Sequence, residues 1–526
     1  MSCPVRRPAT ANRRANATIG VLVPLTEDCH STAGLGLPYQ QLACAALVAV
    51  AHFNAGSTIV VPTMSGLTAQ STSRTGAILL DTLYTSRGAL LAANNVLQEG
   101  VDSVLGTARS TSTASSAQLS YLFDAPQLSY WASSPALSDP VAYPMFSRTY
   151  ASDVVVTQAL CKMISSFDWA AIGVVTDRYD LYASAYADQI REHAPTYGVA
   201  VIASPTFIEQ NEESQQEAVR TLATSRVNVF VAVVVDRDAP TLFAAADAQG
   251  LLSAGYVWIV GDALTSSAAQ GATMSHLSGL LQFYSSASAS GEGFLRFKDA
   301  WGQLSTARGD CNNSIFDAVE SPRIFTEAPF DVAAFVYDGA VALAAAMASA
   351  GPGASGGEIH AALLNLSFDG ASGHVAFDPQ TGDRALDTLN FAFDNWVARN
   401  GTLTVAPAGT FSLSAGRAHS SWVIEWPGGV TTQPSDAYEP PTPSLLENLG
   451  ATFTSWRIVA PAVSLGLTLP VSLAARQKLR GSVSTVSYVG IVLSSIAFCT
   501  DLLFVAQVSH VPTASAPQLT GTSDEQ

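Results

Sequence analysis

The chain has 526 residues, of which 48% are hydrophobic and 13% are charged. This composition supplies buried cores for two or three compact units and excludes a largely disordered protein. The net charge is −17 and the 25 lysine and arginine residues are scattered, which argues against a nucleic-acid partner because phosphate binding needs clustered positive charge.

Strands and helices are expected to alternate along most of the chain. Continuous apolar runs bounded by Asp, Arg or Gly are typical of parallel strands covered on both faces, and the stretches between them are long enough for crossover helices. The expected strands are 19–25, 103–106, 127–130, 171–176, 227–235 and 256–261, and the expected helices are 40–54, 90–98, 112–123, 182–193, 215–224, 240–249, 294–304 and 331–348. This βαβ order predicts doubly wound, Rossmann-like α/β lobes.

Two such lobes fit the chain better than one. Residues 1–17 are expected to be unstructured or incomplete, and residues 18–427 to form a bilobed body. The expected lobe 1 is about 18–149 and 285–370, and the expected lobe 2 is about 150–284 and 371–427, so the chain crosses between lobes three times. Residues 368–384, FDGASGHVAFDPQTGDR, predict a late hairpin in which Gly and Asp-Pro supply the turns.

The last hundred residues predict a membrane attachment. A Pro-rich linker at 428–450 precedes two apolar segments, 458–475 and 488–508, which are long enough to span a bilayer, and a polar tail follows at 509–526. The basic cluster RQKLR between the segments is expected to be cytoplasmic by the positive-inside rule, which places the body outside. The alternative is a pair of hydrophobic helices packed on the body.

The N-terminus lacks the apolar run that a signal peptide needs. We therefore expect an incomplete start, with an intracellular protein as the alternative.

Residues 127–153, QLSYWASSPALSDPVAYPMFSRTYASD, combine an apolar strand, a hydroxyl-rich turn and a Pro-bounded loop. This segment, with the late hairpin, resembles the receptor-family ligand-binding region shared by class C receptors (metabotropic glutamate and GABA-B), receptor guanylate cyclases and bacterial branched-chain amino-acid binding proteins. The matching blocks cover about 18–427, with 266–327 matching poorly. The resemblance implies a type I periplasmic-binding-protein fold, or Venus flytrap, that closes on a small amino acid or analogue.

Hydroxyl side chains at two strand ends are the first candidate ligand contacts. They can point hydroxyls and backbone N–H groups at an anion, with help from a helix dipole. The candidates are Ser110, Thr111, Ser112, Ser133 and Ser134. The resemblance implies that Ser110 and Ser133 hold the α-carboxyl and α-amino groups of an amino acid. An ordinary capped helix is the structural alternative.

The facing lobe is expected to supply acids for the ligand's ammonium. Asp153 and Asp262 match the acidic positions of the glutamate-type receptors, and Asp262 follows an apolar run at a strand's carboxyl end. A helix N-cap is its alternative role. The aromatic residue that covers the ligand in those receptors is replaced by Leu181, flanked by Tyr179 and Tyr182, which puts amino-acid specificity in doubt. Arg109 and Arg178 are candidates for a second acidic group on the ligand.

The resemblance also implies a disulfide near the first strand, between Cys29 and Cys44. Candidate glycosylation sequons begin at Asn16, Asn312, Asn365 and Asn400, all before the apolar tail. The six cysteines form no C-x-x-C pair, and no catalytic motif is present, so we expect no enzyme activity, metal or cofactor.

These observations predict a membrane-anchored extracellular receptor for a small-molecule ligand. The resemblance implies a homo- or heterodimer through lobe 1, to which the apolar face of 40–54 could contribute unless that face is core. The alternatives are a solute-capture protein for uptake and the ectodomain of a truncated receptor guanylate cyclase that senses a peptide.

Overall fold

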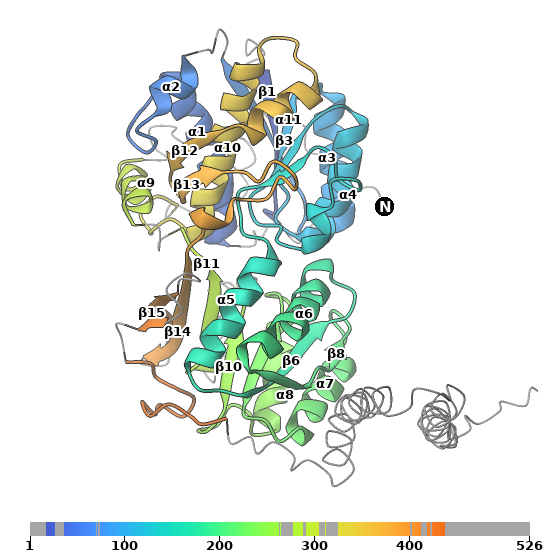
Figure 1. The fold of residues 1–526 in the computed structure, drawn as a ribbon, viewed down its shortest axis with the longest axis vertical. Coiled ribbons are helices and arrows are strands. Elements are labelled where there is room, and N and C mark those ends of the chain that lie inside the picture. Colours follow the sequence, from blue (N-terminus) through green and yellow to red (C-terminus); the bar gives the residue numbers. More distant parts are fainter. Residues whose placement is uncertain are drawn as a thin grey trace, which may run out of the picture. The chain divides into compact units, whose positions relative to one another are not determined.

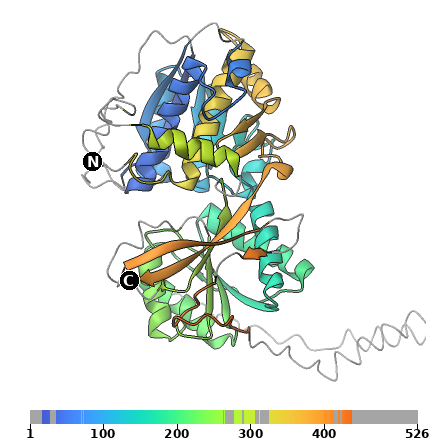
Figure 2. The same cartoon turned by 90° about the vertical axis from the view of Figure 1, so that its left-hand side faces the viewer.

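The computed structural model describes residues 17–26, 36–69, 71, 74–261, 264, 277–287, 291–304, 311, 324–399, 402–411, 418–420 and 423–436. They form two α/β lobes, each built around its own sheet, with a small two-stranded hairpin beside lobe 1 (Figures 1 and 2). The predicted bilobed α/β fold is thereby confirmed.

Lobe 1 has a five-stranded parallel sheet in the order β2-β1-β3-β4-β5. Neighbouring side chains of β1 enter different cores, because successive side chains of a strand point to opposite faces. Val21 packs in the cluster that contains α1 and α10, and Leu22 packs against α3. The strands are β1 Ala17–Val23, β2 Thr75–Asp81, β3 Ser103–Leu105, β4 Gln127–Ser129 and β5 Phe146–Arg148.

Helices from three parts of the chain cover this sheet. They are α1 Leu37–Ala55, α2 Met64–Thr68, α3 Ser86–Gln98, α4 Ser110–Leu122, α9 Glu292–Gly302, α10 Asp331–Ala350 and α11 Gly356–Leu364. Within the described residues, α10 alone has the length and hydropathy of a membrane span, but 89% of its apolar window is buried inside the protein. It packs against α1, whose apolar side chains are also buried, so the face of 40–54 is core and offers no partner surface.

A disulfide joins α1 to the chain beyond α9. It pairs Cys44 with Cys311, whose Cα atoms are 5.4 Å apart. The predicted pairing of Cys44 with Cys29 is therefore wrong, and Cys29 itself lies outside the described residues. The resemblance favoured a partner near the first strand, whereas the structure pairs Cys44 with a cysteine 267 positions further along the chain.

Lobe 2 has a nine-stranded mixed sheet in the order β16-β15-β14-β11-β10-β9-β6-β7, with β8 beside β6. The parallel strands are β6 Ala171–Asp177, β7 Ala200–Ala203, β8 Thr206–Phe207, β9 Val229–Val233, β10 Val257–Val260 and β11 Leu281–Ser285. The antiparallel edge, which the sequence analysis did not predict, is β14 Phe391–Arg399, β15 Thr402–Phe411 and β16 Ala418–Ser420.

Both faces of this second sheet are covered by apolar side chains. Ile172 and Val174 of β6 enter one core, while Ala171 and Val175 enter the other. The helices are α5 Asp153–Ser166, α6 Leu181–His193, α7 Glu212–Thr224 and α8 Ala239–Ala248. The continuous apolar strands therefore have the two-sided burial that their sequence predicted.

The late hairpin consists of β12 Ser367–Gly370 and β13 Gly373–Ala376. Its turn is held by the buried carboxylate of Asp338 in α10, which accepts N–H groups from Ala371 and Ser372 at 2.7 Å each. The expected lobe boundary at residues 370 and 371 cuts through this hairpin. The chain instead rejoins the second sheet at β14.

The segment that follows β16 lies against lobe 2. Trp426 is 2% exposed, and the Trp169 indole N–H donates to the carbonyl of Pro434 at 2.9 Å. The expected linker at 428–450 therefore begins as a docked segment, at least as far as residue 436. Residues 458–475 and 488–508, the expected membrane segments, lie outside the described part of the chain.

Candidate ligand pocket between the lobes

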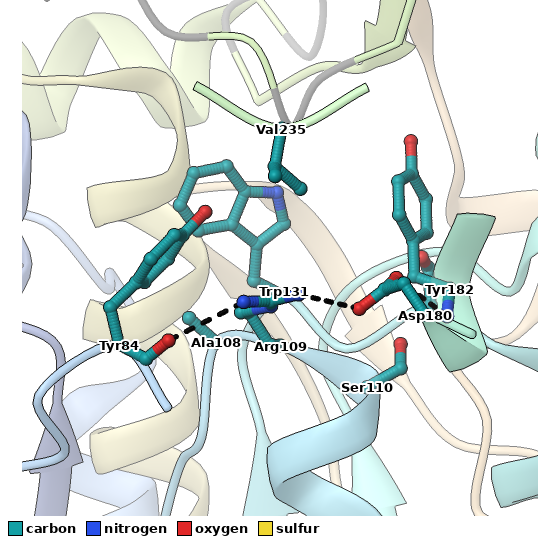
Figure 3. Close-up of a pocket in the computed structure, with 9 residues that line it drawn as sticks. Tyr84, Ala108, Arg109, Ser110, Trp131, Asp180, Tyr182 and Val235 are labelled. Atoms are coloured by element: carbon teal, nitrogen blue, oxygen red, sulfur yellow. Dashed lines mark hydrogen bonds and ion pairs between the residues drawn. The ribbon is translucent and has the colours of Figure 1, made fainter. Parts of the chain in front are cut away.

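A pocket lies where loops from the two lobes meet (Figure 3). The loops leave the carboxyl ends of β2, β3 and β4 in lobe 1 and of β6 and β9 in lobe 2, the edge at which open α/β sheets bind ligands. The pocket holds about 30 Å³, which leaves room for only a few water molecules. Its lining is Tyr84, Ala108, Arg109, Ser110, Trp131, Ser133, Asp180, Tyr182 and Val235.

Two of the predicted hydroxyl residues, Ser110 and Ser133, line this pocket. Ser110 is the first residue of α4 and is 1% exposed, and its Oγ accepts the N–H of Ser134 at 3.1 Å. The helix has no side-chain cap bond at its N-cap, Arg109. The Ser110 hydroxyl thus fastens the neighbouring loop rather than capping its own helix, and its contact with a ligand stays a prediction.

The other three hydroxyl candidates are near the pocket without lining it. Ser112 and Ser134 are buried, at 3% and 0% exposure. Thr111 points across the cleft, where its Oγ1 donates to Asp180 Oδ2 at 3.0 Å and accepts the N–H of Leu181 at 3.0 Å. Thr111 therefore joins the two lobes directly.

The acid in the pocket is Asp180. It is the N-cap of α6, where Oδ1 accepts the N–H groups of Tyr182 and Ala183 at 3.0 Å each. Asp180 lies between an apolar strand and a helix, which is the sequence pattern that made Asp262 a candidate. The same pattern could have identified Asp180 from the sequence.

The two acids expected from the sequence are not in the pocket lining. Asp153 is the buried first residue of α5, and its N–H donates to the carbonyl of Ser133 at 2.8 Å. This bond ties the start of α5 to the loop that carries Ser133. Asp262 lies outside the described residues.

Three aromatic side chains from both lobes wall the pocket. Tyr84 and Trp131 come from lobe 1, and Tyr182, which is 8% exposed, comes from α6. Of the residues predicted here, Tyr179 is 71% exposed and does not line the pocket, and Leu181 contributes its backbone N–H to Thr111. The aromatic side chain of α6 that lines the pocket is thus Tyr182, one position beyond Leu181.

The pocket contains one positive and one negative side chain. Arg109 Nη2 lies 2.6 Å from Asp180 Oδ2, and these side chains are 13% and 3% exposed. Burial by itself lowers the pKa of Arg109, but Asp180, Tyr84 and Glu209 together outweigh burial and the net pKa shift is upward. Burial raises the pKa of Tyr84 to about 12, although Arg109 opposes the shift. Arg109 is therefore charged and Tyr84 neutral at physiological pH.

The remaining predicted residues lie away from the pocket. Arg178 is exposed and donates to Thr206 Oγ1 at 2.9 Å, within lobe 2. Asn365 is exposed at the end of α11, as a glycosylation site requires, while Asn16, Asn312 and Asn400 lie outside the described residues. In the described ranges, no group of three or more His, Cys, Asp or Glu side chains is arranged to hold a metal ion.

Two α/β lobes with a pocket between the carboxyl ends of their strands define a clamshell-type binding protein. The chain belongs to the family described as receptor family ligand binding region, whose model matches residues 41–391. The predicted family is thereby confirmed.

A relative in Dictyostelium discoideum, metabotropic glutamate receptor-like protein E, is 25% identical over 366 residues. The match covers 67% of this chain and 42% of that protein, so the chain spans about two fifths of its relative's length.

Proposed function

We propose that this chain is the sensing part of a membrane-anchored extracellular receptor, which binds a small amino acid or analogue between its lobes and signals by lobe closure. The observation that carries the proposal is the pocket between the lobes, where Ser110 and Ser133 lie beside the Arg109–Asp180 pair. The family match and the receptor-like relative support the receptor role.

The charges in the pocket favour a ligand that carries both a carboxylate and an ammonium. A ligand that separates Arg109 from Asp180 has to supply new partners, because a buried charge left without a partner costs about 3–5 kcal/mol. An amino acid replaces both partners, with its carboxylate near Arg109, Ser110 and Ser133. Its ammonium then faces Asp180 in place of the acids expected from the sequence.

The membrane anchor remains a proposal that depends on residues 458–475 and 488–508. Their length and low charge support two spans, and the basic residues between them support an extracellular body. Cell-surface labelling of an epitope in the body, compared with an epitope in residues 476–480, tests this orientation.

We also propose that a second copy binds lobe 1 through α3 and α4. These helices pack side by side, and they and the C-cap of α4 expose large apolar side chains, which are Leu90, Leu91, Tyr121, Leu122 and Phe123. Sedimentation of the Leu122→Asp variant tests the proposal, because Leu122 is 77% exposed and its replacement weakens a dimer without disturbing the fold.

A thermal-shift screen of the full chain against common amino acids, GABA and small dicarboxylates tests the ligand class. A ligand at about 100 times its dissociation constant stabilises the protein by about 2.7 kcal/mol. A zwitterionic hit that is lost in the double variant Ser110→Ala, Ser133→Ala supports the proposal.

The matched control is Ser115→Ala, on the same helix, whose hydroxyl bonds the carbonyl of Ser112. It should leave the shift intact. Silence across the panel from a folded sample contradicts the proposed ligand class.

A further inference from the structure

We propose that a cluster of charged and aromatic side chains in the pocket lining and next to it is a latch, which sets how much of the protein has its lobes closed. The latch consists of Tyr84, Arg109 and Thr111 of lobe 1 and Asp180, Glu209 and Arg237 of lobe 2. The inference rests on the proposed function in one respect: the cleft that the latch closes is the ligand site.

The first half of the latch joins two helix N-termini. Asp180, at the start of α6, receives hydrogen bonds from Arg109 and Thr111 at the start of α4. Both helices present the positive ends of their dipoles to this point, so the carboxylate is stabilised by each of them. The Leu181 N–H, which has no partner within its own helix turn, donates to Thr111 Oγ1 instead. One carboxylate and one hydroxyl thus bridge the cleft.

The second half is built around the ring of Tyr84. The guanidinium of Arg109 lies 5.2 Å from the ring centroid, and that of Arg237, from the facing lobe, lies 5.1 Å from it. Arg237 also donates to the backbone carbonyl of Tyr84 at 3.0 Å. An aromatic ring attracts a cation at this distance, so the ring holds a side chain from each lobe.

Glu209 bridges the two guanidinium groups. Its Oε1 lies 3.4 Å from Arg109 and 3.3 Å from Arg237. Without this carboxylate, two positive charges on one ring would repel each other across the cleft. With Asp180 and Glu209 present, the four charges of the latch balance, and the closed arrangement gains attraction from both lobes.

The backbone supports Tyr84 in a conformation that non-glycine residues rarely adopt. Leu83 and Tyr84 have φ angles of 53° and 51°, both in the left-handed region. The turn is held by Asp81, whose Oδ1 accepts the N–H of Leu83 at 2.8 Å. Such strain persists where the surrounding structure fixes it and often marks a functional position. Here it places the ring within 5.2 Å of the Arg109 guanidinium and 5.1 Å of the Arg237 guanidinium. Figure 3 shows Tyr84 beside Arg109.

Hydrogen exchange of the Leu181 amide measures the latch directly, in the full chain and without any ligand. The variants are Arg109→Gln, Asp180→Asn and their combination. Asparagine still caps a helix, so Asp180→Asn removes the charge while leaving α6 its N-cap. Arg109 makes no side-chain cap bond, so its replacement leaves α4 intact.

Each single variant should lower the protection factor of the Leu181 amide about tenfold, and the double variant should add little, because both changes break the same Arg109–Asp180 pair. The matched control is Arg220→Gln, which breaks an exposed ion pair with Glu217 within α7 and should change nothing at Leu181. Unchanged protection of β1 amides shows that each variant is folded.

Unchanged protection of the Leu181 amide in both single variants overturns the latch. So does a double variant whose loss of protection equals the product of the two single losses, because the two residues would then act independently. The result is independent of the ligand screen. If the two variants are coupled and no amino acid shifts the melting temperature, the latch stands and the proposed ligand class is rejected. If a zwitterion binds and the variants are uncoupled, the ligand class stands and the latch is rejected.

Discussion

Arg148 and Asp383 lie 235 positions apart in the sequence and form an ion pair, with Nε 2.7 Å from Oδ1. The Arg148 side chain is fully buried, and its Nη1 donates to the carbonyls of Ala132 and Ser134 at 3.1 and 2.9 Å. The pair therefore fastens the loop that carries Ser133 to a turn that follows the late hairpin in the sequence.

The first prediction is that Arg148→Gln destabilises the protein by about 3 kcal/mol, because removing one partner of a buried pair leaves the other charge uncompensated. Urea denaturation followed by circular dichroism measures the loss. Arg191→Gln is the control, since its pair with Asp188 is exposed and its removal should cost less than about 0.5 kcal/mol. Equal losses in the two variants would contradict the role of Arg148.

A second prediction concerns Asp394 on β14. Burial raises the pKa of this carboxyl to about 6, with Asp331 adding to the shift, although the hydroxyl of Tyr284, which donates to Oδ2 at 2.9 Å, opposes it. The folded protein therefore binds a proton at Asp394 more tightly than the unfolded chain does. Protonated Asp394 makes its full contribution to stability below about pH 4. The contribution falls as the pH rises to about 6 and is lost above that.

The free energy of unfolding of Asp394→Asn, measured relative to that of the wild type, should therefore be about 2 kcal/mol higher at pH 7.5 than at pH 4.5. Denaturant titrations of both proteins at the two pH values give this difference. Asp378→Asn is the control at an exposed position. A difference that stays constant with pH would show that Asp394 titrates normally.

The third prediction is that loss of the Cys44–Cys311 disulfide costs about 2–5 kcal/mol, because the bond closes a long loop and restricts the unfolded chain. The double variant Cys44→Ala, Cys311→Ala and the reduced wild type should lose similar stability. Peptide mapping of the unreduced protein checks the pairing itself. A Cys29–Cys44 peptide would overturn it.

The fourth prediction tests the docked segment after β16. Trp426 packs with Phe167 and Trp169, with ring centroids 6.2 and 5.8 Å away. Trp426→Ala should destabilise the protein by about 3 kcal/mol, as expected when a buried aromatic side chain is truncated. Val423→Ala, at a position that is 77% exposed, should have almost no effect in the same denaturation assay. If Trp426→Ala were equally mild, this segment would be a free linker.

The sequence by itself determined the alternation of strands and helices, the bilobed α/β fold and the place of Ser110 and Ser133 at strand ends. These features follow from local patterns: apolar runs of strand length, and small polar residues where each run stops. A parallel α/β sheet brings its strand ends to one edge, so that residues with this local signal meet even when they are far apart in the chain.

Only the tertiary structure decided which partners these residues have. Asp180 rather than Asp153 lies in the pocket because the start of α6 packs against the start of α4, which carries Arg109. Cys44 pairs with Cys311, and Arg148 with Asp383, because packing brings distant segments together. No local pattern encodes such pairs, because the distance between two residues that are far apart in the sequence depends on how whole helices and strands pack. That packing is stabilised by the complete core and not by the pair alone.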